Sequence, residues 1–208
     1  MHDDDIPFNT LFSWLDRLYA QAIKGGLGTD SAEKLAHHYL STFSDIHQAA
    51  DNLVTWESSK AATSGFITGL AGIITLPVAL PAGLTGLLFI QFRMIAAVAI
   101  LGGYSPDDLR TRHLAYICLG GSVAKELLHN TSMHFISQLS FKALEAASEK
   151  TITTLMMHSA VGVATGSASR LIPLMGGIIS GTLDWLLVRS SGALAGEIFL
   201  PDITPHHN

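Results

Sequence analysis

Arg93 is the charged residue whose neighbours in the sequence are least suited to a charge. It follows 32 positions, from Ala61 to Phe92, that contain no Asp, Glu, Lys or Arg. A buried guanidinium without a counter-charge is too costly to persist, so we expect Arg93 to meet a carboxylate or to reach water. Two interpretations stay open: its stem snorkels to the helix surface, or it lines a pocket for an anionic head group or carboxylate. The candidate partners are Asp107, Asp108, Glu126 and Asp184.

The sequence carries no local signature of nucleophilic catalysis or phosphate binding. Neither Gly-x-Ser-x-Gly nor Gly-x-x-x-x-Gly-Lys-Ser/Thr occurs, although these chemistries often use such glycine-framed turns. Cys118 stands among apolar residues, a context typical of a buried small hydrophobe. A hydrolase would need a site assembled only in three dimensions, for which Ser64, His113 and Asp107 are candidates. We therefore expect a non-enzymatic protein and assign no catalytic residue.

The ten histidines are numerous, but their spacing does not suit a metal site. No His-Glu-x-x-His motif occurs, His37 and His38 are adjacent, and His129 and His134 are five apart. Ligands on one helix face need a spacing of four. We expect no metal and no cofactor. Protonating every histidine would change the formal charge from −5 to −5 + 10 = +5, so acid-triggered membrane association is a hypothesis.

Composition excludes several classes of protein. The 208 residues are 48% hydrophobic and only 14% charged, which is unlike a disordered chain. Twelve Lys and Arg face seventeen Asp and Glu, and the absence of a basic stripe argues against nucleic-acid binding. The single cysteine is typical of a reducing compartment. The start, Met1 to Asp5, is acidic and polar, so we expect no secretory signal and a cytoplasmic location.

The first sixty residues are expected to form amphipathic helices that pack on the rest of the chain. Apolar residues recur at helical spacing from Phe8 to Ile23, and the glycines at 25–28 end that helix. Thr29, Asp30 and Ser31 offer N-cap oxygens for the next helix, and Glu33 stands three residues after Asp30, as in a capping box. A second apolar face then extends to Val54, with a break near Ser44.

The uncharged middle is expected to be a proline-bent helical hairpin over residues 65–101. Pro77 and Pro81 interrupt a helix that reaches about Ile74, because proline removes a hydrogen bond and clashes with the preceding turn. A second helix runs from about Pro81 to Leu101. Ser105 is then a candidate N-cap, with Pro106 at the first helical position.

The rest of the chain is also expected to be helical, since no segment shows sustained period-two alternation. The fold class is therefore all-α: a compact multi-helix bundle around the apolar hairpin. We treat the chain as one structural domain, with residues 61–200 as its apolar core. The further helices are expected near 106–119, 122–129, 132–148, 151–170 and 174–199.

Pairs of glycines recur at a spacing of four, which places each pair on one helix face where two backbones can approach closely. Such pairs serve tight packing within a core, association within a bilayer, or contact with a second copy or another protein. No segment is a clean membrane span, because proline or charge interrupts each apolar stretch. The pairs are Gly65 with Gly69, Gly162 with Gly166, Gly177 with Gly181, and Gly192 with Gly196.

Several motifs in order resemble the EcsC family of bacterial proteins. They are Leu76-Pro77-Val78-Ala79-Leu80-Pro81, Arg93, Gly103-Tyr104-Ser105-Pro106-Asp107-Asp108 with Arg112, and the glycine-rich segments at 172–181 and 192–195. The resemblance covers roughly residues 45 to 200. The chain has Ala79 where many members have Asp, and residues 180–184 depart from a Gly-Gly-x-x-Asn pattern. The resemblance implies a helical, membrane-associated domain and supplies no catalytic residue.

These observations favour a lipid- or membrane-surface-binding helical protein, cytoplasmic and peripheral to the inner membrane. The expected ligand is a membrane lipid or another hydrophobic molecule, held or contacted by the hairpin. One alternative is a membrane-inserting, pore-forming bacterial effector or toxin, and a second is the hydrolase named above. The candidate ligand-binding residues are Pro77, Pro81, Arg93, Tyr104 and Arg112.

Overall fold

The computed structural model describes residues 8–26, 28–61, 82–128, 133–164 and 176–200. Apart from an isolated bridge between Gly26 and Thr29, these residues contain no β structure, which confirms the all-α fold class. The helices are α1 (Phe8–Lys24), α2 (Ala32–Thr42), α3 (Ile46–Ala61), α4 (Ala82–Leu101), α5 (Leu109–Leu119), α6 (Gly121–Leu127), α7 (Met133–Ile136), α8 (Phe141–Ala164) and α9 (Gly176–Phe199).

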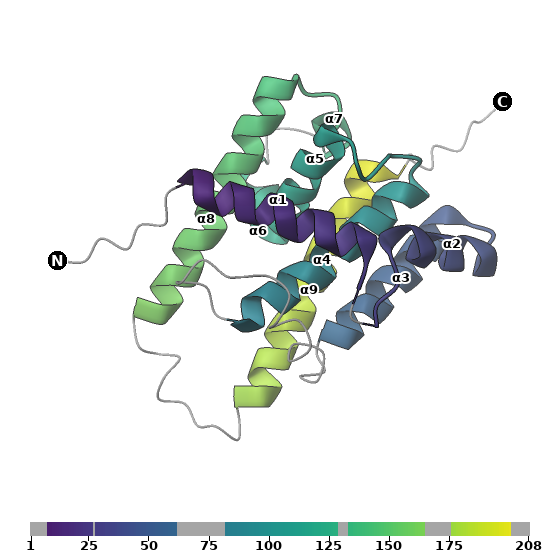
Figure 1. Ribbon diagram of the computed structural model, residues 1–208, viewed down its shortest axis with the longest axis horizontal. Coiled ribbons are helices and arrows are strands. Elements are labelled where there is room, and N and C mark those ends of the chain that lie inside the picture. The colour runs from purple at the N-terminus through teal and green to yellow at the C-terminus, as the bar shows by residue number, and fades with distance from the viewer. Residues whose placement is uncertain (1–7, 27, 62–81, 129–132, 165–175, 201–208) are drawn as a thin grey trace.

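Helix α4 is the centre of the bundle. It packs against α1, α2, α3, α5 and α9 (Figure 1), and its side chains from Thr85 to Ala99 are all buried. A helix that is apolar on every side is stable only when it is covered on every side. The second arm of the expected hairpin is therefore protein core, while its first arm and its two prolines lie outside the described residues.

The connection between α1 and α2 is a tight turn that needs glycine. Gly25 has a φ of +74°, and a Cβ there would come within 2.7 Å of the backbone of Asp30 and Ser31. Gly26 and Thr29 bond to each other through backbone and side chain, with the Thr29 hydroxyl donating to the Gly26 carbonyl at 2.7 Å. This turn fixes where the backbone carbonyl of Asp30 lies.

The structure selects the caps of two helices. Of the candidates Thr29, Asp30 and Ser31, it is Ser31 that caps α2, and its hydroxyl accepts from the Lys34 N–H at 3.2 Å. The cap predicted for α5 is wrong by three residues. Asp108, not Ser105, caps α5, and its carboxylate accepts from the Arg110 N–H at 3.0 Å. In both places neighbouring residues offer cap oxygens, and the residue with extended backbone angles at the junction takes the role.

The predicted break at residues 149–150 is also wrong, because α8 continues through them. The break lies earlier, between α7 and α8. There the Arg110 guanidinium donates to the carbonyl of Ser137 at 2.9 and 2.7 Å and to the carbonyl of Leu139. A side chain from α5 thus satisfies the backbone that the interrupted helix leaves unpaired.

Among the described helices, none is both long enough and apolar enough to cross a membrane.

The break expected near Ser44 is confirmed, since α2 ends at Thr42 and α3 begins at Ile46.

Candidate functional site

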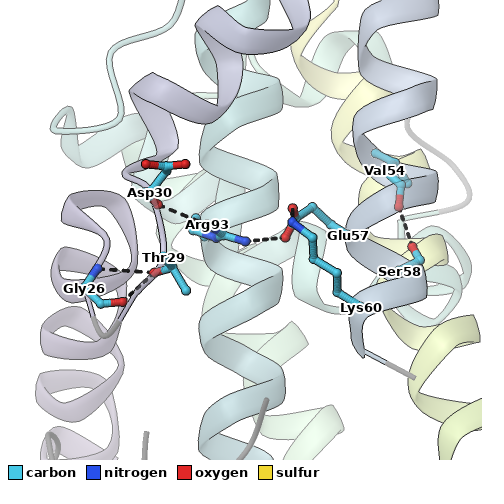
Figure 2. Close-up of polar contacts among 8 residues, drawn as sticks. All are labelled: Gly26, Thr29, Asp30, Val54, Glu57, Ser58, Lys60 and Arg93. Carbon is cyan, nitrogen blue, oxygen red and sulfur yellow. Dashed lines mark hydrogen bonds and ion pairs between the residues drawn. The ribbon is translucent and has the colours of Figure 1, made fainter. Parts of the chain in front are cut away.

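The most deeply buried charges form an ion pair between the middle of α4 and the last two turns of α3. Arg93 is 3% exposed and Glu57 is 0% exposed, and Arg93 Nη2 lies 2.5 Å from Glu57 Oε2. Arg93 Nη1 also donates to the carbonyl of Asp30 at 3.3 Å, and Lys60 Nζ lies 2.9 Å from Glu57 Oε1 (Figure 2). One buried carboxylate therefore holds two cations, and one guanidinium joins three elements of the fold.

This arrangement corrects the expected partners of Arg93. The sequence analysis named Asp107, Asp108, Glu126 and Asp184, whereas the structure places Glu57 at the guanidinium. The Nε–H of Arg93 has no hydrogen-bond acceptor among the described residues. The guanidinium is 3% exposed and paired with Glu57, so a role for Arg93 in ligand binding stays a prediction.

Arg112 and Tyr104 occupy separate positions from Arg93. Arg112 Nη1 lies 3.2 Å from Asp16 Oδ1, which joins α5 to α1, and Asp16 also accepts from the hydroxyl of Tyr116. Tyr104 is half-buried and packs edge-on against Phe199, with ring centroids 5.1 Å apart. The structure therefore does not gather these three candidates into one site, and Pro77 and Pro81 lie outside the described residues.

The two tyrosines beside Arg112 are held in their neutral forms. Burial, followed by the hydrogen bond to Asp16, raises the pKa of Tyr116, and burial raises the pKa of Tyr19, whose hydroxyl donates to the Pro106 carbonyl at 2.9 Å. Each phenol is thus a fixed hydrogen-bond donor: Tyr116 joins α5 to α1, and Tyr19 joins α1 to the turn before α5.

His113 is the candidate base with a nucleophile nearby, but that nucleophile is Ser148. His113 Nδ1 lies 2.9 Å from Ser148 Oγ. The Ser148 hydroxyl donates to the Glu145 carbonyl at 2.8 Å, so its single proton is used and it accepts from the imidazole. Ser148 is also completely buried. Ser64 lies outside the described residues and Asp107 is exposed, so this geometry does not present a hydrolytic nucleophile to a substrate.

We expect replacement of His113 by glutamine to flatten the dependence of stability on pH. Burial lowers the pKa of His113; Arg112 lowers it further, while the carboxylates of Glu145, Asp16 and Glu149 oppose this. The unfolded chain therefore binds the proton more readily, and stability is lost as pH falls below about 6.5. Urea unfolding at about pH 7.5 and about pH 5.5 measures the change.

The matched control for this experiment is His38→Gln, because His38 is an exposed histidine on α2. The His38 variant should keep the pH dependence of the parent protein. An unchanged pH dependence in the His113 variant would contradict the prediction.

Cys118 is inert in this fold. It is free and fully buried, and burial raises the pKa of its thiol. Among the described residues, no group of three or more His, Cys, Asp or Glu side chains is placed to hold a metal ion.

The neighbouring helices α3 and α9 each carry exposed apolar side chains. Trp56 on α3 is 59% exposed, and Leu186 and Leu187 on α9 are 50% and 46% exposed. Lys60 Nζ lies 5.9 Å from the centre of the Trp56 ring. We call these four residues the α3–α9 edge. Sequence reasoning missed it, although a tryptophan at an outward position of an amphipathic helix was a visible signal.

The chain matches no curated protein and no solved structure. A family model described as the EcsC protein family matches residues 10–199. That range includes every described helix almost in full, the buried ion pair and the α3–α9 edge. The chain therefore belongs to the EcsC protein family.

Proposed function

We propose that this protein binds the surface of a lipid membrane, without catalysing a reaction, and that the α3–α9 edge makes the contact. The observation that carries the proposal is the exposure of Trp56, Leu186 and Leu187, with Lys60 placed beside the Trp56 ring. Indole rings are amphipathic and favour the membrane–water interface, where lysine stems lie along hydrocarbon and their ammonium groups reach phosphate.

Two contacts relate the positions of Trp56 and Leu186 along the paired helices. Arg189 on α9 donates to the Thr55 hydroxyl on α3, and Gly192 on α9 approaches Val54 on α3, so the two helices are antiparallel neighbours. Trp56 directly follows Thr55, and Leu186 precedes Arg189 by about one helical turn. Trp56 and Leu186 therefore lie toward the same end of the bundle.

Four helix ends lie at that end of the bundle, and the segments that join them in sequence are the least charged parts of the chain. Figure 1 shows the end of α3, the start of α4, the end of α8 and the start of α9 at the same end of the molecule. In sequence, residues 62–81 between α3 and α4 contain no Asp, Glu, Lys or Arg, and residues 165–175 between α8 and α9 contain Arg170 alone. A low density of charge reduces the cost of approaching hydrocarbon.

The contact is peripheral in this proposal. Full burial of one large apolar side chain contributes about 1.5–3 kcal/mol, so three half-exposed side chains supply a few kcal/mol, which corresponds to weak and reversible binding. Inserting α4 would separate it from the helices that cover it and would carry Arg93 into the bilayer or strip it from Glu57.

Vesicle flotation tests the proposal. The parent protein should float with vesicles of phosphatidylethanolamine and phosphatidylglycerol, and the variant Trp56→Ala/Leu186→Ala/Leu187→Ala should lose about tenfold or more of its affinity. The matched control is Leu109→Ala on α5, since Leu109 is 52% exposed and directly precedes Arg110, which bonds the turn before α8. Equal loss in both variants, or no flotation of the parent protein, would refute the proposal.

A further inference from the structure

A groove opens where α3 and α9 diverge beyond their closest contact. At Gly192 the two helices touch, because a Cβ there would lie 2.5 Å from Val54 Cγ1. About one turn later, a Cβ on Gly196 would meet only Leu200 Cδ1, at 4.0 Å. The space between the helices has a volume of about 710 Å³, which lies within the range of small-molecule sites.

The floor and the rim of this groove differ in chemistry. The floor of the groove is apolar and consists of Val54, Gly192, Gly196 and Leu200. Its two glycines have no side chain that would project into the groove. The rim carries ionisable and amide groups from both helices. A ligand that fits must therefore combine a narrow hydrocarbon body with charged groups.

The charge of the rim is negative. Asp45, Asp51 and Glu197 line it, and Arg189 is the one lysine or arginine among the described lining residues. Arg189 is 3.9 Å from Asp51, and Glu197 pairs with Lys125. A carboxylate has about four acceptor positions, so these single contacts leave the carboxylates of Asp51 and Glu197 able to accept more hydrogen bonds.

Cations are therefore favoured over anions in the groove. Even with Lys125 paired to Glu197, three carboxylates outnumber the lysine and arginine side chains at the groove, and the formal charge of the whole chain is −5. Both act in the same direction on an approaching cation.

We propose that the groove between α3 and α9 binds a linear di- or polyamine. Its ammonium groups donate to the carboxylates of Asp45, Asp51 and Glu197, and its methylene chain lies on the floor at Gly192 and Gly196. This site does not depend on membrane contact, because its three carboxylates and Gly196 lie toward the start of α3 and the end of α9, and neither Trp56 nor Leu186 lines the groove.

Isothermal titration calorimetry with spermidine, at low ionic strength and on the full chain, tests the site. The parent protein should bind spermidine and should not bind 1,8-octanediol, which has a comparable hydrocarbon chain without charge. Gly196→Leu should abolish binding by filling the groove, and its circular dichroism should remain that of the parent protein. Glu197→Gln should weaken binding about tenfold, the effect of losing one charge-assisted contact.

The change in affinity of the variant Arg189→Gln distinguishes binding of a cation from binding of an anion. Removing the rim's guanidinium should strengthen spermidine binding several-fold, whereas it would weaken binding of an anion. The control Asp107→Asn changes an exposed carboxylate outside the groove and should leave the affinity unchanged. The proposal is overturned if spermidine gives no binding heat, if Gly196→Leu binds it like the parent protein, or if Arg189→Gln weakens binding.

Discussion

Replacing Glu57 by glutamine is expected to lower the free energy of unfolding by about 3–5 kcal/mol. The substitution leaves the guanidinium of Arg93 buried with only the Asp30 carbonyl and a neutral amide as acceptors. Arg93→Met should cost less, because the remaining carboxylate keeps Lys60 as a counter-charge. Urea unfolding followed by circular dichroism measures each change.

The double variant Glu57→Leu/Arg93→Met keeps this prediction testable even where a single variant fails to fold. Removing both charges removes both desolvation costs, so the double variant should recover most of the stability that Glu57→Gln loses. Lys60→Met is the control, since Lys60 is half-exposed and its pairing should contribute less than about 1 kcal/mol. A double variant less stable than either single variant would contradict the account.

The second large effect is expected at Gly192. Gly192→Ala places a methyl group 2.5 Å from Val54 Cγ1 and 3.1 Å from Met94 Cε, and overpacking of this kind costs about 1–3 kcal/mol. Gly196→Ala is the matched control on the same helix, because its methyl group would meet only Leu200 Cδ1, at an ordinary contact distance of 4.0 Å. There the higher helix propensity of alanine should stabilise the protein by up to about 1 kcal/mol.

Thermal unfolding of the two glycine variants measures both changes in stability. Opposite shifts in melting temperature are expected: a decrease for Gly192→Ala and an increase for Gly196→Ala. Shifts of the same sign would mean that α3 and α9 do not approach each other at Val54.

The ion pair and Gly192 together explain why α4 stays inside the protein. Glu57 and Val54 belong to the same helix, α3, which contacts α4 through Arg93 and α9 through Gly192. Moving α4 toward a bilayer would break the first contact and expose the apolar surface that the surrounding helices cover. The structure therefore separates two roles: an apolar core helix, and an exposed edge that is proposed to meet lipid.

Periodicity in the sequence was enough to predict most helices, since an amphipathic face is visible without tertiary information. The bounds of α4 and the break before α3 followed from glycine, proline and polar residues. The break before α8 could not be predicted, because it depends on Arg110 reaching the carbonyls of Ser137 and Leu139 from another helix. The spacing of residues within one segment does not indicate contacts that another helix makes with it.

The partner of Arg93 could have been found from the pattern of α3. Ala50, Leu53, Val54 and Glu57 occupy positions i, i+3, i+4 and i+7, so the carboxylate stands on the apolar face. An acid in that position needs a buried cation, and Arg93 is the cation in the most apolar surroundings. The groove was beyond sequence reasoning, since it depends on how far α3 and α9 diverge after Gly192.

Fluorescence quenching by nitroxide lipids tests membrane contact at the α3–α9 edge most directly. A thiol-reactive bimane at Leu187→Cys reports the edge and one at Leu109→Cys reports α5, while the buried Cys118 stays unlabelled. On vesicles, we expect strong quenching at position 187 by nitroxides near the head groups, weaker quenching by nitroxides deep in the acyl chains, and none at position 109. Equal quenching at the two positions, no quenching at 187, or stronger quenching there by the deep nitroxides would contradict a peripheral contact through this edge.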